Sequence, residues 1–374
     1  MQQDLQQILA SYNADAPLSE ASTIPAPFYT DARIAELERQ SVFSQTWQWG
    51  GRKDQVDQPG KFVTFTVAGE PLVVVRGQDN ELRAFFNVCR HHAAAVLTQP
   101  SGTASILRCP YHGWSYDLNG ALKGTPEFQG VCNFDRSQNG LVPIAVDTWE
   151  NFVFVNLDPR ANSLHDFLGG LTRRCEPLGF SRLRYVDSRI YELNCNWKVF
   201  VDNYLDGGYH VPHLHKGLNS VLEYQQYTIE NEDRYCLQSS PMTSGSDVKI
   251  SATRRGDRAY YFWQYPNLMI NCYEGYMDTN LVIPLSVDRC RIIFDFYFDK
   301  TGGEHDAYNQ QSIEVSHRVQ MEDAGICEDV QRGLHSRAYR QGRLSVRREA
   351  GEHLFHRLLA EDLKRGLAKI SDSA

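Results

Sequence analysis

Short apolar runs fill the first part of the chain after Trp47. They are rich in β-branched and aromatic residues and are separated by Gly, Asp and Asn, which is the pattern of antiparallel strands joined by turns. The runs read KFVTFTVAG, PLVVVRG, LRAFFNV, VPIAVDTW and NFVFVNLD. We therefore predict a small all-β domain that ends near Pro159.

The rest of the chain mixes helical and strand patterns. A helix is expected at residues 164–176, ended by Pro177, and apolar residues at helical spacing predict long helices at 304–334 and 345–370. Strands are expected at 234–238, 260–265, 268–273, 280–284 and 289–299. The fold class is therefore α+β.

Three parts are expected along the chain. Residues 1–22 and 31–45 have helical character, with Asp31 as N-cap and a connector at 24–29. We expect an N-terminal helical segment at 1–44 that packs on the last part, a β-domain at 45–160 and a larger α+β domain at 161–374.

Composition limits the classes of partner and the compartment. The net charge of −8 argues against nucleic acid and against an anionic membrane surface. No apolar run approaches the roughly 18 residues of a transmembrane helix, and no signal peptide is recognisable. Nine scattered cysteines favour free or metal-bound thiols over a disulfide framework. A cytoplasmic protein is expected.

Two short motifs in the β-domain point to one metal site. Cys89 and His91 form a Cys-x-His pair, and Cys109 and His112 form a Cys-x-x-His pair, each beside turn-forming residues. Zinc accepts these ligand types, but zinc motifs usually keep cysteines together and histidines together. One cysteine and one histidine on each arm suit a Rieske [2Fe–2S] cluster, with two thiolates on one iron and two imidazoles on the other. His92, beside His91, lies outside the pattern and is expected at the surface or next to a ligand.

A second candidate metal site lies in NWKVFVDNYLDGGYHVPHLH, residues 196–215. Two imidazoles and one carboxylate hold the metal in non-haem Fe(II) oxygenases. On a continuous helix, His210 and His215 would point about 140° apart, so their pairing requires Pro212 to break the helix between them. His210 and His213, at i and i+3, are the other possible pair. The simplest alternative is a polar helix end whose histidines cap backbone carbonyls.

Both motifs together resemble the α subunits of Rieske non-haem iron oxygenases over nearly the whole chain. The resemblance rests on CRHHAAAV, CPYHGWSYDLNG, the histidine segment and EDAGICEDVQRGL, in that order. Within the family, DNYLDGGYHVP, YPNLMIN and MDTNLVIPL are most similar to choline monooxygenases. The resemblance implies a helix-grip catalytic domain, in which an antiparallel sheet and long helices enclose a mononuclear Fe(II).

The resemblance also implies residue roles. His210 and His215, rather than His213, would bind the iron together with Asp323. From the residues alone, Asp323 is one of several acids on an expected helix, and a solvated acidic face is the favoured explanation for any one of them taken singly. Family members form rings, so a homotrimer or a multiple of it is implied. A carboxylate would then connect the Rieske histidine of one chain with the mononuclear site of the next.

We expect Asp206 to be that carboxylate, with Asn203 adding a further hydrogen bond. Many relatives place the acid three residues before the first iron-binding histidine, a position occupied here by Gly207. The Gly207-Gly208 pair would let the backbone open and bring Asp206 to the usual place. Asp202 is the competing acid, and a plain helix-surface role is the alternative for both.

The function implied is that of an O₂-dependent monooxygenase acting on a small quaternary ammonium substrate such as choline. The product would be betaine aldehyde hydrate, on the route to glycine betaine. No GxGxxG follows a strand, so electrons would come from a separate ferredoxin or flavin reductase. Aromatic-acid hydroxylation or oxidative demethylation is the alternative reaction. An electron-transfer protein without oxygenase activity is a remote alternative, because it has no use for the histidine segment.

An aromatic-rich stretch is the candidate substrate wall. Tyr260–Tyr265 reads YYFWQY, and Tyr273 and Tyr276 follow. Aromatic rings attract a quaternary ammonium cation through their faces. The alternative is that a strand with so many rings lies mostly in the core.

Overall fold

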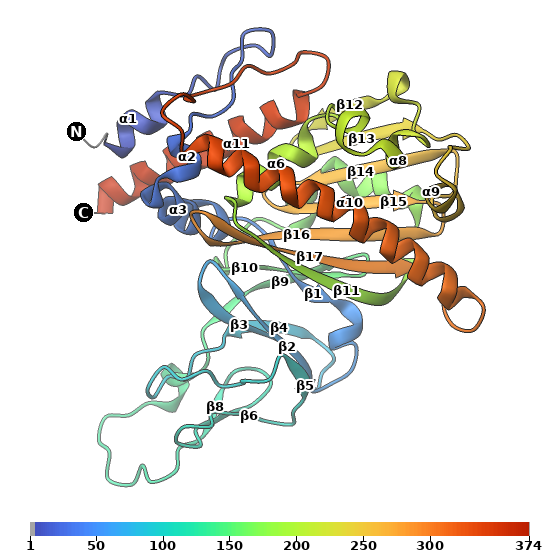
Figure 1. Ribbon diagram of the computed structural model, residues 1–374. Helices are drawn as coiled ribbons and strands as arrows, with labels where there is room; N and C mark the ends of the chain where they lie inside the picture. Colours follow the sequence, from blue (N-terminus) through green and yellow to red (C-terminus); the bar gives the residue numbers. More distant parts are fainter. Residues whose placement is uncertain (1–3, 374) are drawn as a thin grey trace. The chain divides into compact units, whose positions relative to one another are not determined.

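The computed structural model describes residues 4–373, which form two compact units (Figure 1). One unit is Val42–Phe167. The other joins the described residues up to Ser41 with those from Leu168 onward. Each unit is built around one antiparallel seven-stranded sheet.

The Val42–Phe167 unit is the predicted all-β domain. Its main sheet has the order β1-β10-β9-β4-β3-β2-β5, and a three-stranded sheet has the order β6-β7-β8. The strands are β1 (Gln48–Arg52), β2 (Lys61–Val67), β3 (Glu70–Arg76), β4 (Leu82–Phe86), β5 (Ser101–Thr103), β6 (Leu107–Arg108), β7 (Ser115–Tyr116), β8 (Leu122–Gly124), β9 (Pro143–Trp149) and β10 (Phe152–Asn156).

The uninterrupted apolar run of β3 is explained by burial of both its faces. Val73 and Val75 pack with Cys89, Cys109 and the residues around them. Leu72 and Val74 point the other way and pack with Val153 and Val155 of β10 in a second cluster. Because successive strand residues point to opposite faces, an entirely apolar strand supplies two cores at once.

The second unit has the order β11-β17-β16-β15-β14-β13-β12. Its strands are β11 (Arg184–Leu193), β12 (Thr228–Glu232), β13 (Tyr235–Pro241), β14 (Arg258–Gln264), β15 (Leu268–Tyr273), β16 (Tyr276–Ser286) and β17 (Arg289–Phe298). The long helices α10 (His305–Leu334) and α11 (Ala350–Ser373) lie across the sheet beside α6 (Trp197–Leu205) (Figure 1). This sheet with long helices confirms the predicted helix-grip architecture and the α+β class.

Shorter helices connect these elements, and two of the sequence predictions differ from them. They are α1 (Leu5–Ala10), α2 (Pro27–Thr30), α3 (Ala32–Glu38), α4 (Leu164–Leu168), α5 (Gly170–Cys175), α7 (Val211–Leu214), α8 (Lys216–Asn219) and α9 (Val248–Thr253). The single helix predicted at 164–176 is wrong, because Gly169 has a φ of 53° and separates α4 from α5. The predicted connector at 24–29 contains the start of α2, whose first residue is Pro27, a position that proline favours.

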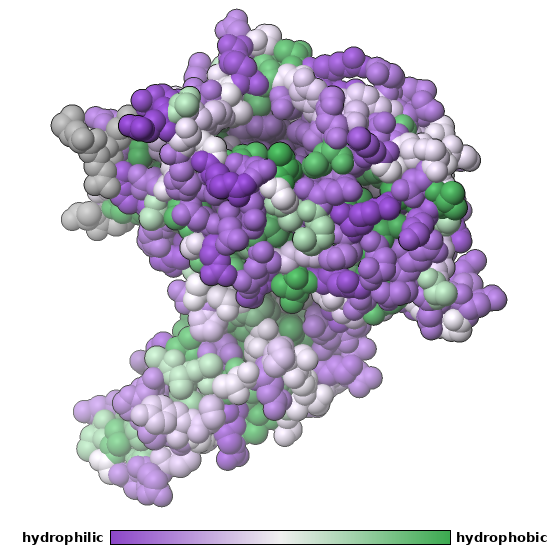
Figure 2. Space-filling model, in the orientation of Figure 1, coloured by the Kyte–Doolittle hydropathy of each residue, from purple (hydrophilic) through white to green (hydrophobic). Residues whose placement is uncertain are grey.

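No helix among residues 4–373 combines the length and the apolar character needed to cross a membrane. Hydrophilic side chains predominate on the face that Figure 2 shows.

A buried ion pair ties the N-terminal segment to α6. Lys198 is 0% exposed, and its Nζ lies 2.5 Å from Oε1 of Glu38 at the end of α3. Trp197 donates its indole N–H to the other Glu38 oxygen at 2.8 Å. Asn196 caps α6 through its side-chain oxygen and donates to the carbonyl of Tyr29 at 2.9 Å. Burial lowers the pKa of Lys198, and the Glu38 carboxylate opposes that shift.

We predict that Glu38→Gln destabilises the protein by about 3–5 kcal/mol, because it leaves the Lys198 charge buried without its partner. Urea denaturation followed by tryptophan fluorescence measures the change. The control is Glu36→Gln on the same helix, which removes an exposed pair with Arg39 and should change stability by less than about 1 kcal/mol. Equal effects of the two substitutions would show that the buried pair does not hold the segment.

Candidate metal centres and active-site cavity

Two loops of similar conformation present the predicted cluster ligands. In the first, the backbone N–H of Cys89 donates to Ala94 at 2.8 Å and that of Ala93 to Cys89 at 3.0 Å. In the second, Cys109 donates to Trp114 at 2.8 Å and Gly113 to Cys109 at 3.1 Å. Each loop therefore folds back tightly just after its cysteine.

The side chains of these loops converge. Cys89 and Cys109 are 3% and 2% exposed, and the rings of His91 and His112 lie 4.7 Å apart. His91 stacks on the Trp114 ring at 4.7 Å, while His92 is exposed. Burial raises the pKa of the Cys109 thiol, and the neighbouring Cys89 adds to the shift.

The surroundings of one nitrogen atom show whether these four side chains fit a metal cluster. Nδ1 of His91 is buried and has no hydrogen-bond partner among the described residues. Buried polar atoms are almost always paired, so an orphaned imidazole nitrogen beside two buried thiols suits a missing ligand. The donor set of two sulfurs and two nitrogens matches a Rieske cluster.

The histidine segment changes direction at two glycines. Helix α6 ends at Leu205, and Gly207 and Gly208 follow with φ of 67° and 68°. A Cβ on Gly207 would lie 2.0 Å from the carbonyl oxygen of Arg348, so only glycine fits there.

The expected role of Pro212 is wrong. It does not break a helix between the histidines but lies in the first turn of the separate helix α7. Proline fits there because the first helical N–H groups need no partner within the helix. His210 is the N-cap residue of α7 and His215 its C-cap residue, so one helical turn separates them.

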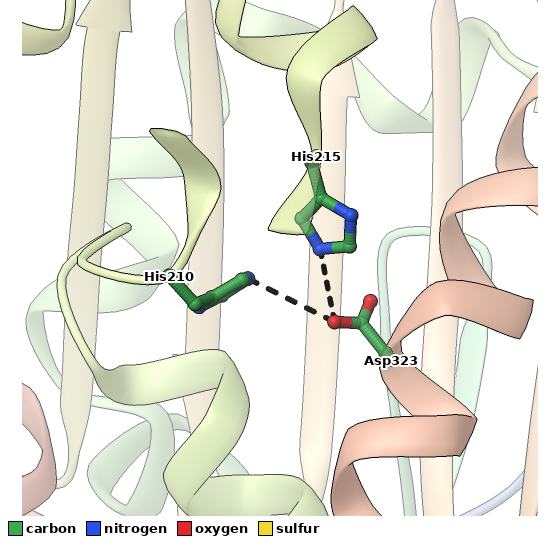
Figure 3. Close-up of side chains that lie close together, drawn as sticks. All are labelled: His210, His215 and Asp323. Atoms are coloured by element: carbon green, nitrogen blue, oxygen red, sulfur yellow. Dashed lines mark hydrogen bonds and ion pairs between the residues drawn. The ribbon is translucent and has the colours of Figure 1, made fainter. Parts of the chain in front are cut away.

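His210, His215 and Asp323 come together in the structure (Figure 3). Their ligand atoms all lie within 4.8 Å of one another. Oδ1 of Asp323, on α10, is 2.9 Å from Nε2 of His215 and 3.8 Å from Nε2 of His210. His213 is exposed and lies outside this group. Two imidazoles and one carboxylate that converge in this way are the ligand set of the facial triad, which binds non-haem iron and leaves its other coordination positions open.

Carboxylates hold the outer nitrogens of both histidines. Nδ1 of His210 is 2.6 Å from Oδ2 of Asp206, and Nδ1 of His215 is 2.6 Å from Oε2 of Glu322. An ionised carboxylate only accepts, so each Nδ1 carries the hydrogen and each Nε2 is left to face Asp323. Burial lowers the pKa of both imidazoles, but their carboxylate neighbours outweigh it, so both pKa values are raised.

Glu322 begins the EDAGICEDVQRGL segment of the sequence, but no role was predicted for it. The adjacent acids gave a signal, since consecutive residues on one helix turn can contact the metal and its ligand respectively. Asn203 lines the cavity beside this group.

The competing acid, Asp202, belongs to another hydrogen-bonded group. It accepts from the Tyr29 hydroxyl at 2.5 Å and lies 2.9 Å from Nε2 of His356. Asp202, Glu352 and His356 are also close enough to hold a metal. However, the backbone N–H of Ile24 donates to Nδ1 of His356 at 3.3 Å. In the neutral ring Nε2 then carries the hydrogen and cannot bind a metal, so this group stabilises the fold.

A cavity of about 120 Å³ opens beside His210, His215 and Asp323. It holds several times the volume that one water needs, which is room for a small organic molecule. Its aromatic lining is Phe200, Tyr204, Tyr227, Tyr261, Tyr273 and Phe294. Of the predicted aromatic wall, Tyr261 and Tyr273 line the cavity, whereas Phe262, Trp263, Tyr265 and Tyr276 are buried and absent from its lining.

Comparison with known proteins decides the family. Residues 46–135 match the Rieske [2Fe-2S] domain, and residues 180–365 match the catalytic domain of ring hydroxylating alpha subunits. Choline monooxygenase from Arabidopsis thaliana is 39% identical over 96% of this chain and 87% of its own length. The chain belongs to the Rieske non-haem iron oxygenases. This confirms the resemblance seen in the sequence and the predicted cofactors, a Rieske [2Fe–2S] cluster and a mononuclear iron.

Other relatives of this Rieske oxygenase act on different substrates. The carnitine monooxygenase oxygenase subunit of Escherichia coli K12 is 33% identical over 92% of this chain and 95% of that protein. A solved quaternary ammonium Rieske monooxygenase has a TM-score of 0.84 at 29% identity, covering 96% of this chain and 99% of the other. Naphthalene 1,2-dioxygenase from Rhodococcus shares the fold, with a TM-score of 0.76 at 21% identity.

We predict that Cys109→Ala abolishes the cluster, because the remaining ligands cannot hold both irons and metal binding stabilises the loops. Visible absorption and acid-labile sulfide analysis measure the loss. The control is Cys132→Ala, since Cys132 is an exposed thiol of the same unit. A Cys109→Ala protein with the full Rieske spectrum would refute the ligand assignment.

For the mononuclear site, His210→Ala and His215→Ala should each remove one iron and leave the cluster spectrum unchanged. His213→Ala should retain both metals, because its side chain is exposed outside the group. Iron analysis with visible spectroscopy distinguishes the three variants. The opposite pattern, with iron lost from His213→Ala and kept in His215→Ala, would favour the i, i+3 pair.

Proposed function

We propose that this protein is the oxygenase component of a monooxygenase that hydroxylates a small quaternary ammonium compound. The observation that carries the proposal is the position of His210, His215 and Asp323 at an aromatic-lined cavity. A pure electron-transfer protein needs neither the three converging side chains nor the cavity.

The chain supplies two ligand sets in this proposal. Cys89, His91, Cys109 and His112 hold the cluster, and His210, His215 and Asp323 hold the mononuclear iron. When bound, the cluster supplies single electrons and the iron supplies O₂ activation. Asp206 and Glu322 keep the Nδ1 hydrogens in place, which orients both imidazoles toward the metal position.

The aromatic part of the cavity suits a trimethylammonium group, which has no N–H groups. The single hydrogen of the Tyr204 hydroxyl is shared between two acceptors, Oδ1 of Asn271 at 2.9 Å and the carbonyl oxygen of Phe262 at 3.1 Å. The hydroxyls of Tyr261 and Tyr273 bond to each other at 2.9 Å. A trimethylammonium group needs no hydrogen-bond acceptor, and each desolvated ring face can contribute about 0.5–2 kcal/mol to its binding.

Choline is the candidate substrate that the sequence suggests, with betaine aldehyde hydrate as the product and glycine betaine synthesis as the context. The relatives support the quaternary ammonium class, since they are a choline monooxygenase and the oxygenase subunit of a carnitine monooxygenase. Aromatic-acid hydroxylation or demethylation remains the alternative on the same scaffold.

The protein would work with a separate ferredoxin or flavin reductase as electron donor. We further propose a cytoplasmic homotrimer or a multiple of it, in which Asp206 connects His210 to a Rieske histidine of the neighbouring subunit. A related solved structure is described as showing inter-subunit electron transfer. The hydrogen bond between Asp206 and His210 supports this proposal, because it would form this chain's part of that route.

The function is tested by O₂ uptake with an artificial reductase across choline, glycine betaine, carnitine and a benzoate. Uptake stimulated by quaternary ammonium compounds, with stoichiometric hydroxylated product, is expected. Stimulation by the benzoate alone would replace the proposal with aromatic-acid oxidation.

We predict that Asp206→Asn retains both metals and a reducible cluster but lowers turnover by about two orders of magnitude or more. The amide keeps the size of the side chain but removes the charge that holds the His210 Nδ1 hydrogen. The control is Asp202→Asn, four residues earlier on α6, which should retain turnover because its contacts are to Tyr29 and His356. The rate of cluster reoxidation, measured by stopped flow, distinguishes the Asp206→Asn variant from the Asp202→Asn control. Near-normal turnover of Asp206→Asn would show that electrons take another route.

A further inference from the structure

A buried arginine faces the active-site cavity. Arg254 follows α9, is 7% exposed and belongs to the lining that includes His210, His215 and Asp323. Among the residues that the structure describes, no carboxylate forms an ion pair with it. A buried charge that no carboxylate contacts directly is unfavourable in a folded protein, so its retention at a cavity wall indicates a partner that arrives with a ligand.

Neutral groups hold the guanidinium in place. Its nitrogens donate to Oγ of Ser312 at 2.6 Å and to Oγ of Ser316 at 2.7 Å, both on α10. Its central carbon lies 4.5 Å from the ring centre of Tyr276 and 4.9 Å from that of Tyr273. These contacts fix the side chain without neutralising it. One nitrogen also donates to the carbonyl oxygen of Ser312 at 3.5 Å, and the five N–H donors of the guanidinium outnumber these three acceptors.

The acid whose charge acts on Arg254 already has hydrogen-bond donors of its own. Asp278 is 2% exposed and accepts from the Tyr276 hydroxyl at 2.5 Å, from Asn271 at 2.8 Å and from Asn280 at 2.8 Å. Burial raises its pKa, although these donors and Arg254 oppose the shift. The Tyr276 hydroxyl also contacts Ser316 at 2.8 Å, so hydroxyl groups stand between the acid and the guanidinium.

This arrangement distinguishes two kinds of quaternary ammonium compound. A bare cation such as choline would enter beside a fixed positive charge in a poorly solvated cavity, where like charges repel strongly. A zwitterion brings its own carboxylate, and a guanidinium pairs with carboxylates through parallel N–H donors.

We propose that Arg254 binds the carboxylate of the substrate, so that the oxygenase acts on zwitterionic quaternary ammonium acids in preference to choline. This inference rests on the proposed function and adds a carboxylate-binding subsite to it. The aromatic lining holds the trimethylammonium end, and Arg254 fixes the position of the other end in the cavity.

The test compares ligands that share the trimethylammonium group and differ in the carboxylate. Glycine betaine and carnitine are each paired with their primary amide, which has similar size and no charge at that end. KM for O₂ uptake and Kd by calorimetry are measured on the metal-loaded protein. We expect both constants to be at least about tenfold lower for the acid than for its amide.

Arg254→Gln should remove that preference and leave the constants for the amides nearly unchanged. Arg254→Lys, which keeps the charge, should retain part of the preference. The matched control is Arg255→Gln, because Arg255 is exposed, lies over the Tyr308 ring at 4.0 Å and is absent from the cavity lining. That control should behave like the wild type.

Equal use of acid and amide by the wild type would overturn the inference even if no Arg254 variant folds. Equal weakening of both ligands by Arg254→Gln would also overturn it, as would choline being the best substrate; either result leaves the proposed function intact. Failure of every quaternary ammonium compound, acid or neutral, would instead reject the proposed function.

Discussion

The metal site depends on a backbone constraint at Gly207. The left-handed conformation of Gly207 ends α6 just before the histidines. No other residue fits there, because a Cβ would lie 2.0 Å from the carbonyl oxygen of Arg348. Because the helix ends there, His210 and His215 flank a separate helical turn instead of diverging along a continuous helix. The carboxylate of Asp206, at the C-terminal end of α6, is then left beside the first histidine. Ligand spacing, ring tautomer and the proposed electron route all follow from this one change of direction.

Helix α10 unites the chemistry of the site. One of its turns carries Asp323 toward the metal position and Glu322 toward His215. Two earlier turns carry Ser312 and Ser316, which hold Arg254 at the cavity wall. A single rigid helix thus sets the distance between the reacting centre and the proposed carboxylate subsite. A fixed distance of this kind suits an enzyme that must place one particular carbon of a flexible substrate next to the oxidant.

The sequence predicted features that are encoded locally and missed those that depend on distant contacts. The apolar strands and the Cys89 and Cys109 loops lie within short motifs, so their pattern was sufficient. Strand β12, TIENE, was not predicted, because it is a mostly exposed edge strand and lacks an apolar pattern. Pro212 was misinterpreted because proline can either end a helix or begin one. Here Gly207 and Gly208 follow the end of α6, and Pro212 lies in the first turn of the next helix. Of the adjacent Arg254 and Arg255, only tertiary packing decides which one is buried at the cavity.

The central claim is that one chain holds two separate iron centres and consumes O₂ at the second. The most direct measurement is mild chelation of the purified protein, followed by iron analysis, visible spectroscopy and substrate-dependent O₂ uptake. The account predicts loss of roughly one iron in three, loss of O₂ uptake, an unchanged Rieske spectrum and recovery of uptake on adding Fe(II). O₂ uptake that persists after that iron is removed, with the cluster intact, would contradict the account.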